Sequence, residues 1–253
     1  MPPSGSVNES SASSLPSFTQ ADLRLLDNPI WNALGSEHAH FALDNGLARR
    51  YPAAIGPLSG MGDYNALGYD ALRTLAGPGG VVGLFLESKP NVPAGWTMVR
   101  DGLMNQMVCE AAAADAPANA ADGAEIVGLS KAADGPEMVA LARLTEPGPF
   151  NERTMELGTF FGIREQGRLV AMAGERMSWP RFTEVSAVCT HPDVRGRGYA
   201  AACMQAVMRH IRACGKTPML HVFAANEPAI RVYRHLGFTV RRTLELAIIR
   251  NDG

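Results

Sequence analysis

The sequence predicts a mixed α+β fold in two parts, with the second part organised around a strand, a glycine-bearing loop and a helix. The main observation is the stretch 184–200, where an alternating apolar segment ends before Pro192 and helix formers begin at Tyr199. Two apolar segments within 160–173 have the pattern of a hairpin. The alanine-rich run 111–123 contains proline and glycine, and it separates the two parts as a linker.

Composition places the chain among soluble globular proteins. It has 253 residues, 46% hydrophobic content and a formal net charge of −2. A net charge near zero provides no basic footprint, so a nucleic-acid partner is not expected. No apolar run is long enough to span a bilayer, so no membrane partner is expected either. Residues 1–20 lack the basic and apolar regions of a signal peptide, and they are interpreted as a disordered tail of a cytoplasmic protein.

The cysteines indicate core packing rather than metal binding. None of the four forms a Cys-x-x-Cys pair, and each falls in an expected strand or helix: Cys109, Cys189, Cys203 and Cys214. They are interpreted as small buried residues of a reducing compartment, and no metal site is expected.

Residues 21–110 are expected to form a smaller α/β domain. Its elements are a helix from Pro29 to Leu47, a helix at 66–75, a glycine turn at 77–80, a strand at 81–86 and one or two strands within 96–110. Asp27 or Asn28 would cap the first helix, because both residue types accept hydrogen bonds from the first turn. The glycine turn precedes a strand rather than a helix, so it is interpreted as a connector and not as a phosphate loop.

Residues 124–253 carry the second domain, in an order that alternates strands and helices. The expected elements are a strand at 125–129, a helix at 136–144, a short helix at 154–157, a hairpin at 160–173, a strand at 184–190, a helix from Tyr199 ended by Gly215, a strand at 219–223, a helix at 228–236 and final strands within 238–249.

The loop before Tyr199 is suited to an anion. Gly196 and Gly198 allow close approach of the backbone, and Arg195 and Arg197 add positive charge. The helix that follows presents unpaired N–H groups and the positive end of its dipole. The sequence therefore predicts that a phosphate group binds here.

Two common phosphate-binding motifs do not fit this loop. A dinucleotide fingerprint begins directly after its strand and has an acidic residue about 20 positions later. Here the segment 192–195 separates the strand from Gly196, and the next strand, 219–223, has no carboxylate. A Walker loop would need Gly-Lys-Ser/Thr, which the sequence lacks.

The loop instead resembles the acyl-coenzyme A signature of the GNAT superfamily of N-acyltransferases, Arg/Gln-x-x-Gly-x-Gly/Ala, here 195–200. A second motif of that superfamily, Asn-x-x-Ala-x-x-x-Tyr-x-x-x-Gly-Phe, is matched at 226–238. The resemblance covers about the second half of the chain. It implies a central, mostly antiparallel sheet that splays between its fourth and fifth strands, with helices on both faces.

The place of the smaller domain ahead of this one resembles the glycine N-acyltransferase branch, in which a degenerate GNAT-like half precedes the active one. A helical lid or a dimerisation domain would fit residues 21–110 as well. A homodimer is left open.

Two residues are candidates for proton transfer. Glu184 occupies the place of the carboxylate that is assigned as general base in glycine N-acyltransferases; an exposed glutamate at a strand end is the alternative. A glutamate pKa of about 4.3 lies far below that of an amine, so burial or a water relay would be needed. Tyr233 would be the general acid by the family's motif, and a core aromatic is the alternative.

The resemblance also implies the co-substrate site for acetyl-CoA or another acyl-CoA. The candidate binding residues are Val188, Cys189, Thr190, Arg195, Gly196, Arg197, Gly198, Tyr199, Ala200 and Asn226. Backbone groups of 188–190 would serve the pantetheine arm and the oxyanion. Asn226 would contact pantetheine, cap the helix at 228–236, or do both.

The expected function is transfer of an acyl group, most simply acetyl, from acyl-CoA to a primary amine by direct attack in a ternary complex. Cys189 has no histidine partner in the sequence pattern, so a covalent acyl-enzyme is not expected. The alternative from another class is an inert acyl-CoA-binding or sensing module. The acceptor would be a small-molecule amine or amino acid, with a protein amine as an option and tRNA disfavoured. The sequence does not indicate the size of the acyl pocket or the length of the acyl chain.

Overall fold

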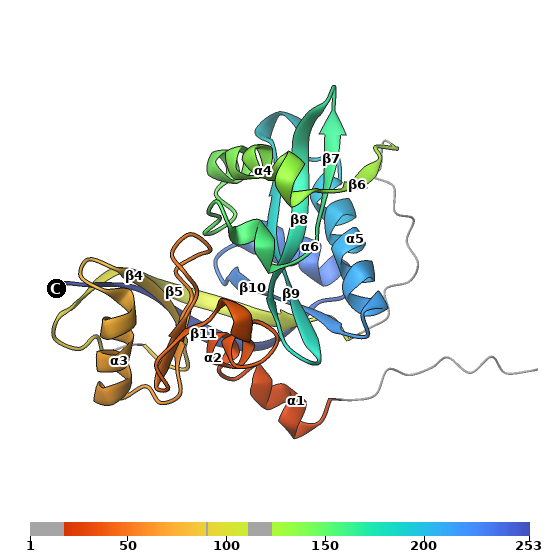
Figure 1. Cartoon of the computed structure of the whole chain (residues 1–253). Coiled ribbons are helices and arrows are strands. Elements are labelled where there is room, and N and C mark those ends of the chain that lie inside the picture. Colours follow the sequence, from red (N-terminus) through yellow and green to blue (C-terminus); the bar gives the residue numbers. More distant parts are fainter. Residues whose placement is uncertain (1–17, 90, 111–122) are drawn as a thin grey trace, which may run out of the picture.

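The computed structural model describes residues 18–89, 91–110 and 123–253. Most of the predicted tail and the predicted linker lie outside these residues. The described chain contains an eight-stranded sheet in the order β4-β11-β5-β10-β9-β8-β7-β6 and a three-stranded sheet in the order β1-β2-β3 (Figure 1). The fold is mixed α+β, as the sequence predicts.

One half of the large sheet follows the chain order. It contains β6 (Ile126–Gly128), β7 (Phe160–Glu165), β8 (Arg168–Ser178) and β9 (Phe182–Thr190), paired antiparallel in sequence. The predicted hairpin is β7–β8, and it turns at Gln166 and Gly167, which both have positive φ. Positive φ at two central residues matches the right-handed twist of the flanking strands.

Helices cover both faces of this half, on either side of β7–β9 in Figure 1. They are α4 (Lys131–Thr145) and α5 (Tyr199–Ala213), with the 3₁₀ turn η2 (Thr154–Leu157) beside α4. On β9, Ala187 and Cys189 pack in the cluster of α4, whereas Val188 packs against the cluster of α5. Alternate residues of a strand point to opposite faces, so the strand is buried from both sides. Helix α4 begins five residues before the predicted start, where the Ser130 side chain accepts from the Ala133 N–H.

The sheet splays between β9 and β10 (Thr217–Phe223). These two strands are the only parallel pair among the described strands, and their register contains three residue pairs, from Thr217↔Phe182 to Met219↔Glu184. Beyond Glu184 the strands separate. They are the fourth and fifth strands counted from β6, so the predicted splay is confirmed.

The other half of the sheet interleaves segments that are far apart in sequence. Strand β5 (Trp96–Val108) lies between β10 and β11 (Thr239–Asn251), and β4 (Val81–Leu86) pairs with the outer edge of β11. Strands of residues 21–110 and of residues 124–253 therefore belong to one continuous sheet. The division into two domains stays a prediction, and the sheet runs across it.

Residues before β4 form a small layer against the large sheet. It contains α1 (Gln20–Leu25), α2 (Pro29–Leu34), the 3₁₀ turn η1 (Ala39–Phe41), the short strands β1 (Leu43–Asp44), β2 (Ala48–Arg50) and β3 (Ser59–Met61), and α3 (Ala66–Ala76). The prediction of one helix from Pro29 to Leu47 was wrong, because the helix ends at Leu34 before Gly35. Asn28 does not cap it through its side chain, which donates to the Met61 carbonyl instead.

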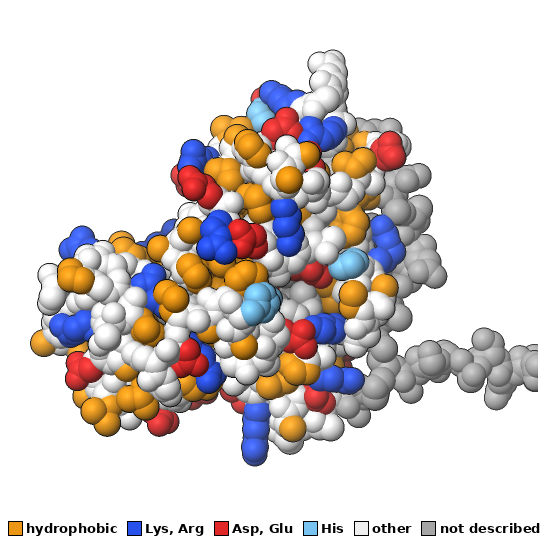
Figure 2. Space-filling model, in the orientation of Figure 1, with side chains coloured by type: hydrophobic (Ala, Val, Ile, Leu, Met, Phe, Trp, Pro, Cys, Tyr) orange, Lys and Arg blue, Asp and Glu red, His pale blue; other side chains and the backbone are white. Residues whose placement is uncertain are grey.

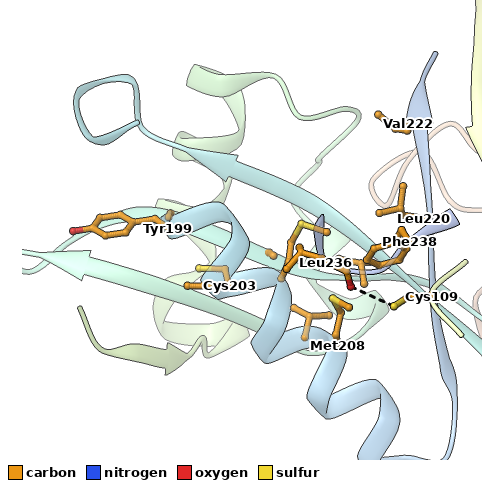
Figure 3. Packing of buried hydrophobic residues seen from close by; sticks show 14 of the residues in the cluster. Cys109, Tyr199, Cys203, Met208, Leu220, Val222, Leu236 and Phe238 are labelled. Atoms are coloured by element: carbon orange, nitrogen blue, oxygen red, sulfur yellow. Dashed lines mark hydrogen bonds between the residues drawn. The ribbon is translucent and has the colours of Figure 1, made fainter. Parts of the chain in front are cut away.

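Four clusters of buried apolar side chains hold these layers together. The largest joins α5 to the sheet and to the end of β5, and Figure 3 shows Met208, Phe238 and Cys109 gathered in it. Three of the cysteines are buried as predicted, but Cys214 is exposed because it follows the last residue of α5. Helix α6 (Glu227–His235) closes this side.

Candidate active site

A cavity of about 1330 Å³ follows the splay of the sheet. At one end it is lined by β9, by the loop before α5 and by α6. At the other end the lining side chains come from both sequence halves: Leu58, Phe85, Arg100, Met104, Leu246 and Ile248. A ligand in this cavity would therefore contact the predicted phosphate loop and the small N-terminal layer together.

The loop before α5 presents an uncapped helix N-terminus to the cavity. Gly196 and Gly198 have φ values of 83° and 78°, in the left-handed region that favours glycine. Gly198 is the N-cap of α5, and it makes no side-chain cap hydrogen bond. Arg195, both glycines and Ala200 line the cavity. The first-turn N–H groups of a helix and its dipole favour an anion.

Two of the predicted binding residues hold the loop in place instead of facing the cavity with free polar groups. The Arg197 guanidinium contacts the Glu165 carboxylate at 2.9 Å, and the Tyr199 hydroxyl donates to the same oxygen at 2.6 Å. Tyr199 lines the cavity but is only 2% exposed. Glu165 lies at the end of β7, and no signal in the sequence identified its role.

Strand β9 forms the wall beside the loop. Ala187 has a φ of 51°. Met172 of β8 pairs with Cys189 of β9, and Gly174 pairs with Ser186, so β9 has one more residue than β8 between these two pairs. This is a β-bulge, which leaves backbone groups unpaired. The Thr190 Oγ1 atom is buried and has no hydrogen-bond partner among the described residues. Burial raises the pKa of the Cys189 thiol to about 11, so this sulfur stays protonated and is a poor nucleophile.

Glu184 is fully buried at the closed end of the splay. The Arg176 guanidinium donates to both carboxylate oxygens, at 2.8 and 2.5 Å, and His221 Nδ1 lies 2.7 Å from one of them. Burial raises the pKa of Glu184, but the charge and hydrogen bonds of Arg176, together with the hydrogen bond of His221, lower it to about 2. The alternative prediction, that Glu184 is an exposed glutamate at a strand end, is therefore wrong. Arg176 and His221 line the cavity.

The polar chain continues from His221 into β5. Gln106 Nε2 lies 3.1 Å from His221 Nε2 and donates to the Leu26 carbonyl, while Gln106 Oε1 accepts from Arg241. Because an amide nitrogen only donates, His221 Nε2 accepts and its proton is on Nδ1, directed at Glu184. Arg241 in turn pairs with Asp27 at 2.6 Å. Sequence analysis missed His221 because a single histidine in a strand has no distinguishing pattern.

Helix α6 supplies the last two predicted residues. The Asn226 side chain accepts from the Ala229 N–H at 3.3 Å, so its predicted capping role is confirmed, and it also lines the cavity. Tyr233 lines the cavity and packs against Phe238, with ring centroids 6.3 Å apart. Burial raises the pKa of Tyr233 to about 12. The phenol therefore carries its proton at neutral pH.

Other features of the described residues bear on the expected partners. No group of three or more His, Cys, Asp or Glu side chains is placed to hold a metal ion, and no helix is long and apolar enough to cross a membrane. On the face shown in Figure 2, acidic and basic side chains are interspersed.

Comparisons with known proteins agree with this architecture. Residues 160–246 match the family model described as FR47-like protein. The structure is similar to that of an acetyltransferase of the GNAT family from Novosphingobium aromaticivorans DSM 12444, with 37% identity, a TM-score of 0.77, and coverage of 90% of this chain and 99% of that one.

A GCN5-related N-acetyltransferase from Kribbella flavida has the same fold. The identity is 15% and the TM-score 0.61, over 91% of this chain and 95% of that one. No curated protein matches the chain. None of these comparisons identifies the glycine N-acyltransferase branch, so that finer placement stays a prediction.

Proposed function

The chain belongs to the GNAT family of acetyltransferases, and on that basis we propose that it moves an acyl group, acetyl in the first instance, from acyl-CoA to a primary amine. The uncapped N-terminus of α5, at the rim of the cavity that contains Tyr233, is the observation that carries the proposal. Direct attack in a ternary complex fits a site whose one cavity-lining thiol, among the described residues, is buried and protonated.

The described residues fit the phosphates and the pantetheine arm of the co-substrate. A Cβ atom added at Gly196 would meet no atom within 4 Å, so there is space beside the loop for a ligand. We assign the phosphates to Arg195 and to the backbone from Gly196 to Ala200, with Arg197 and Tyr199 holding the loop. The pantetheine arm is assigned to Asn226 and to the segment 188–190, where Thr190 Oγ1 has no hydrogen-bond partner in the described part of the chain.

When bound, the thioester supplies an activated acyl group to the amine. A carbon–nitrogen bond forms, the carbon–sulfur bond breaks, the amine loses a proton and the sulfur gains one. We assign to Tyr233 the donation of the proton that the sulfur gains. A phenol with a pKa of about 12 is a weaker acid than a thiol of about 8.5, so the transfer depends on how closely the site holds the hydroxyl.

Glu184 is proposed to act through its neighbours. A carboxylate with a pKa of about 2, engaged by Arg176 and His221, is too weak a base to deprotonate an alkylammonium directly. Its proposed role is to fix the guanidinium and the imidazole in the cavity wall. An acceptor with a low ammonium pKa, such as an α-amine near 8, is already partly neutral at pH 7 and needs the least help.

The remaining expectations are also proposals. The acceptor is a small-molecule amine or amino acid, with a protein amine as the alternative. A cytoplasmic location and a homodimer remain predictions.

Thermal unfolding with and without acetyl-CoA tests the co-substrate site. A ligand that binds only the native state stabilises it by about 2.7 kcal/mol at a hundredfold excess over its Kd. Gly198→Glu places a carboxylate at the N-terminus of α5 and should abolish this stabilisation. Gly215→Glu is the matched control, because Gly215 also has positive φ, at 74°, but follows the other end of α5.

If both variants respond like the wild type, the proposed site is wrong. A second assay, release of thiol from acetyl-CoA upon addition of amines, distinguishes an enzyme from the inert binding module. Stabilisation by acetyl-CoA without thiol release, over a broad panel of amines and peptides, would favour the inert module.

A further inference from the structure

A second cavity lies on the far side of the loop 147–151, between the small layer and β4. It has a volume of about 560 Å³, within the range of small-molecule sites. Its lining is largely apolar, with one charged side chain, Arg50: Leu43, Ala53, Pro57, Leu75, Ala76, Val81 and Pro149 contribute the apolar part. We call it the Arg50 groove.

Arg50 is placed there by the alternation of β2. Ala48 and Arg50 lie on the same face of this strand, and Ala48 is fully buried in the cluster between α3 and β4. Arg50 follows at the end of the strand, where this core opens into the groove. The residue is 5% exposed. A guanidinium thus lies at the inner wall of an apolar groove.

Its partners are unusual for a buried cation. Nε donates to the Tyr51 carbonyl at 3.2 Å and Nη1 to the Leu75 carbonyl at 3.3 Å, both long bonds to neutral groups. No carboxylate among the described residues lies within 4.0 Å of it to form an ion pair. Burial, with no acidic neighbour to oppose it, lowers the pKa of Arg50.

Three other partly buried arginines have carboxylate partners, whereas Arg73, which also has no ion pair among the described residues, donates to the Ala94 carbonyl and lies over the Trp96 ring. Arg176 is paired with Glu184, Arg164 with Asp134 and Glu137, and Arg241 with Asp27. Buried charges in proteins are generally paired, because the loss of hydration is otherwise uncompensated. Arg50 has the burial of these residues without their counter-ion.

We propose that the Arg50 groove binds a carboxylate that carries an apolar chain. The planar guanidinium matches a carboxylate, and the apolar walls suit an alkyl or aryl chain. A dianionic phosphate fits less well, because there is a single cation and because Leu75 and Ala76 are the last residues of α3, at the negative end of its dipole. The site is separate from the acyl-transfer cavity and does not depend on the function proposed for it.

The groove is linked to the acyl-transfer cavity through a shared wall. Pro149 lines both cavities. The segment after it is fastened to residues 53–55 by three hydrogen bonds, from Asn151 to the Ala53 carbonyl, from the Arg153 N–H to the Ala54 carbonyl and from the Thr154 hydroxyl to the Ile55 carbonyl. A ligand in the groove would therefore contact the segment that also borders the acyl-transfer cavity.

Isothermal titration with octanoate, below its micellar concentration and with acetyl-CoA present to occupy the main cavity, tests the proposal. Octanol and octylamine are the neutral and cationic probes of equal chain length. We expect octanoate to bind the wild type more tightly than either, and Arg50→Gln to weaken octanoate at least tenfold while leaving octanol unchanged. Arg50→Lys should recover part of the loss.

A second variant tests the site without altering Arg50. Ala53 lines the groove and is exposed, so Ala53→Glu would supply a carboxylate from the chain itself and should compete with octanoate. The proposal is overturned if octanoate does not bind the wild type, if both variants bind it as the wild type does, or if Gly198→Glu abolishes octanoate binding while the two groove variants retain it.

Discussion

The two halves of the eight-stranded sheet are built in different ways. From β6 to β9 each strand pairs with the next strand along the chain, and the connecting helices cover the faces. From β10 to β4 the order is β10-β5-β11-β4, so strands from the start and the end of the chain alternate. The loop proposed to bind phosphate belongs to the sequential half, whereas the opposite end of the cavity, where the acceptor is proposed to bind, belongs mainly to the interleaved half.

The two halves are proposed to have different roles, co-substrate binding in the sequential half and acceptor choice in the interleaved half. The sequential half provides α5, its loop and the bulged β9, which are proposed to hold the co-substrate. The interleaved half provides the less regular wall of Arg100, Met104 and Leu246. Changes in the first should affect co-substrate binding, and changes in the second should affect stability or acceptor choice.

The largest effect is expected from Tyr233→Phe, in the co-substrate part of the cavity. Loss of a general acid slows catalysis by about 10²–10⁴-fold. Stabilisation by acetyl-CoA should be unchanged, because the ring and its packing on Phe238 remain. Steady-state thiol release and thermal unfolding measure the two properties. An unchanged rate would remove Tyr233 from the mechanism.

The second prediction concerns the junction of the halves, where Glu184 of β9 contacts His221 of β10, which contacts Gln106 of β5. Glu184→Gln leaves the Arg176 charge buried without its partner, and such a loss costs roughly 3–5 kcal/mol of unfolding free energy. Glu156→Gln removes an exposed ion pair with Arg153 and should cost less than about 1 kcal/mol. Denaturant unfolding compares the two variants.

The same carboxylate gives a pH dependence with a defined sign. Its pKa is about 2 in the folded state and 4.5 in the reference state, so its contribution is fully present above about pH 5 and is lost as the pH falls towards 2. The wild type should therefore lose more stability than Glu184→Gln between pH 5 and 2. Equal losses would show that the pair does not contribute.

A core substitution in β5 tests whether the halves unfold together. Met107 is fully buried against the α5 cluster, and Met107→Ala should cost about 2–5 kcal/mol. Leu103, on the same strand, is 52% exposed, so Leu103→Ala should change stability by less than about 0.5 kcal/mol. A single transition whose midpoint shifts for Met107→Ala would indicate one cooperative unit. Two transitions would indicate separate domains.

The smallest effect comes from a pair of helix caps. Asn226 caps α6 in the cavity, and Asn65 caps α3 in the small layer by accepting from the Gly68 N–H. Each change to alanine should cost about 1 kcal/mol. Asn226→Ala should also weaken acetyl-CoA binding, which titration calorimetry measures. If Asn65→Ala weakens binding as much, Asn226 acts only as a cap.

The sequential half was predictable because its signals are local. The hairpin turn and the start of α5 at Tyr199 follow from short patterns, and the splay follows from the family resemblance that the two motifs carry. The interleaving was not predictable, because β5 has the same apolar content whichever strand it pairs with, and β11 continues without a break where several strands were expected. Periodicity identifies a strand but not its neighbours.

The candidate site divides in the same way. Gly196, Gly198, Asn226 and Tyr233 line one cavity, and the roles that their motifs predict stay proposals. The partners of Glu184, Arg176 and His221, did not follow from the sequence, because they lie on two other strands that meet β9 only in the fold.

The position of β5 has a consequence for synthesis of the chain. The Thr97 hydroxyl in β5 donates to the Asp252 carboxylate, which follows the end of β11 and lies 155 positions later. At a ribosomal rate of about 5–20 residues per second, that interval lasts roughly 8–30 s. The partner of one edge of β5 is β10, and the partner of the other edge is β11, which is made last. Until β11 is made at least one edge lacks its final partner, and unpaired edges promote association between chains. Nascent chains halted before β11 should therefore depend on chaperones more than the completed protein does.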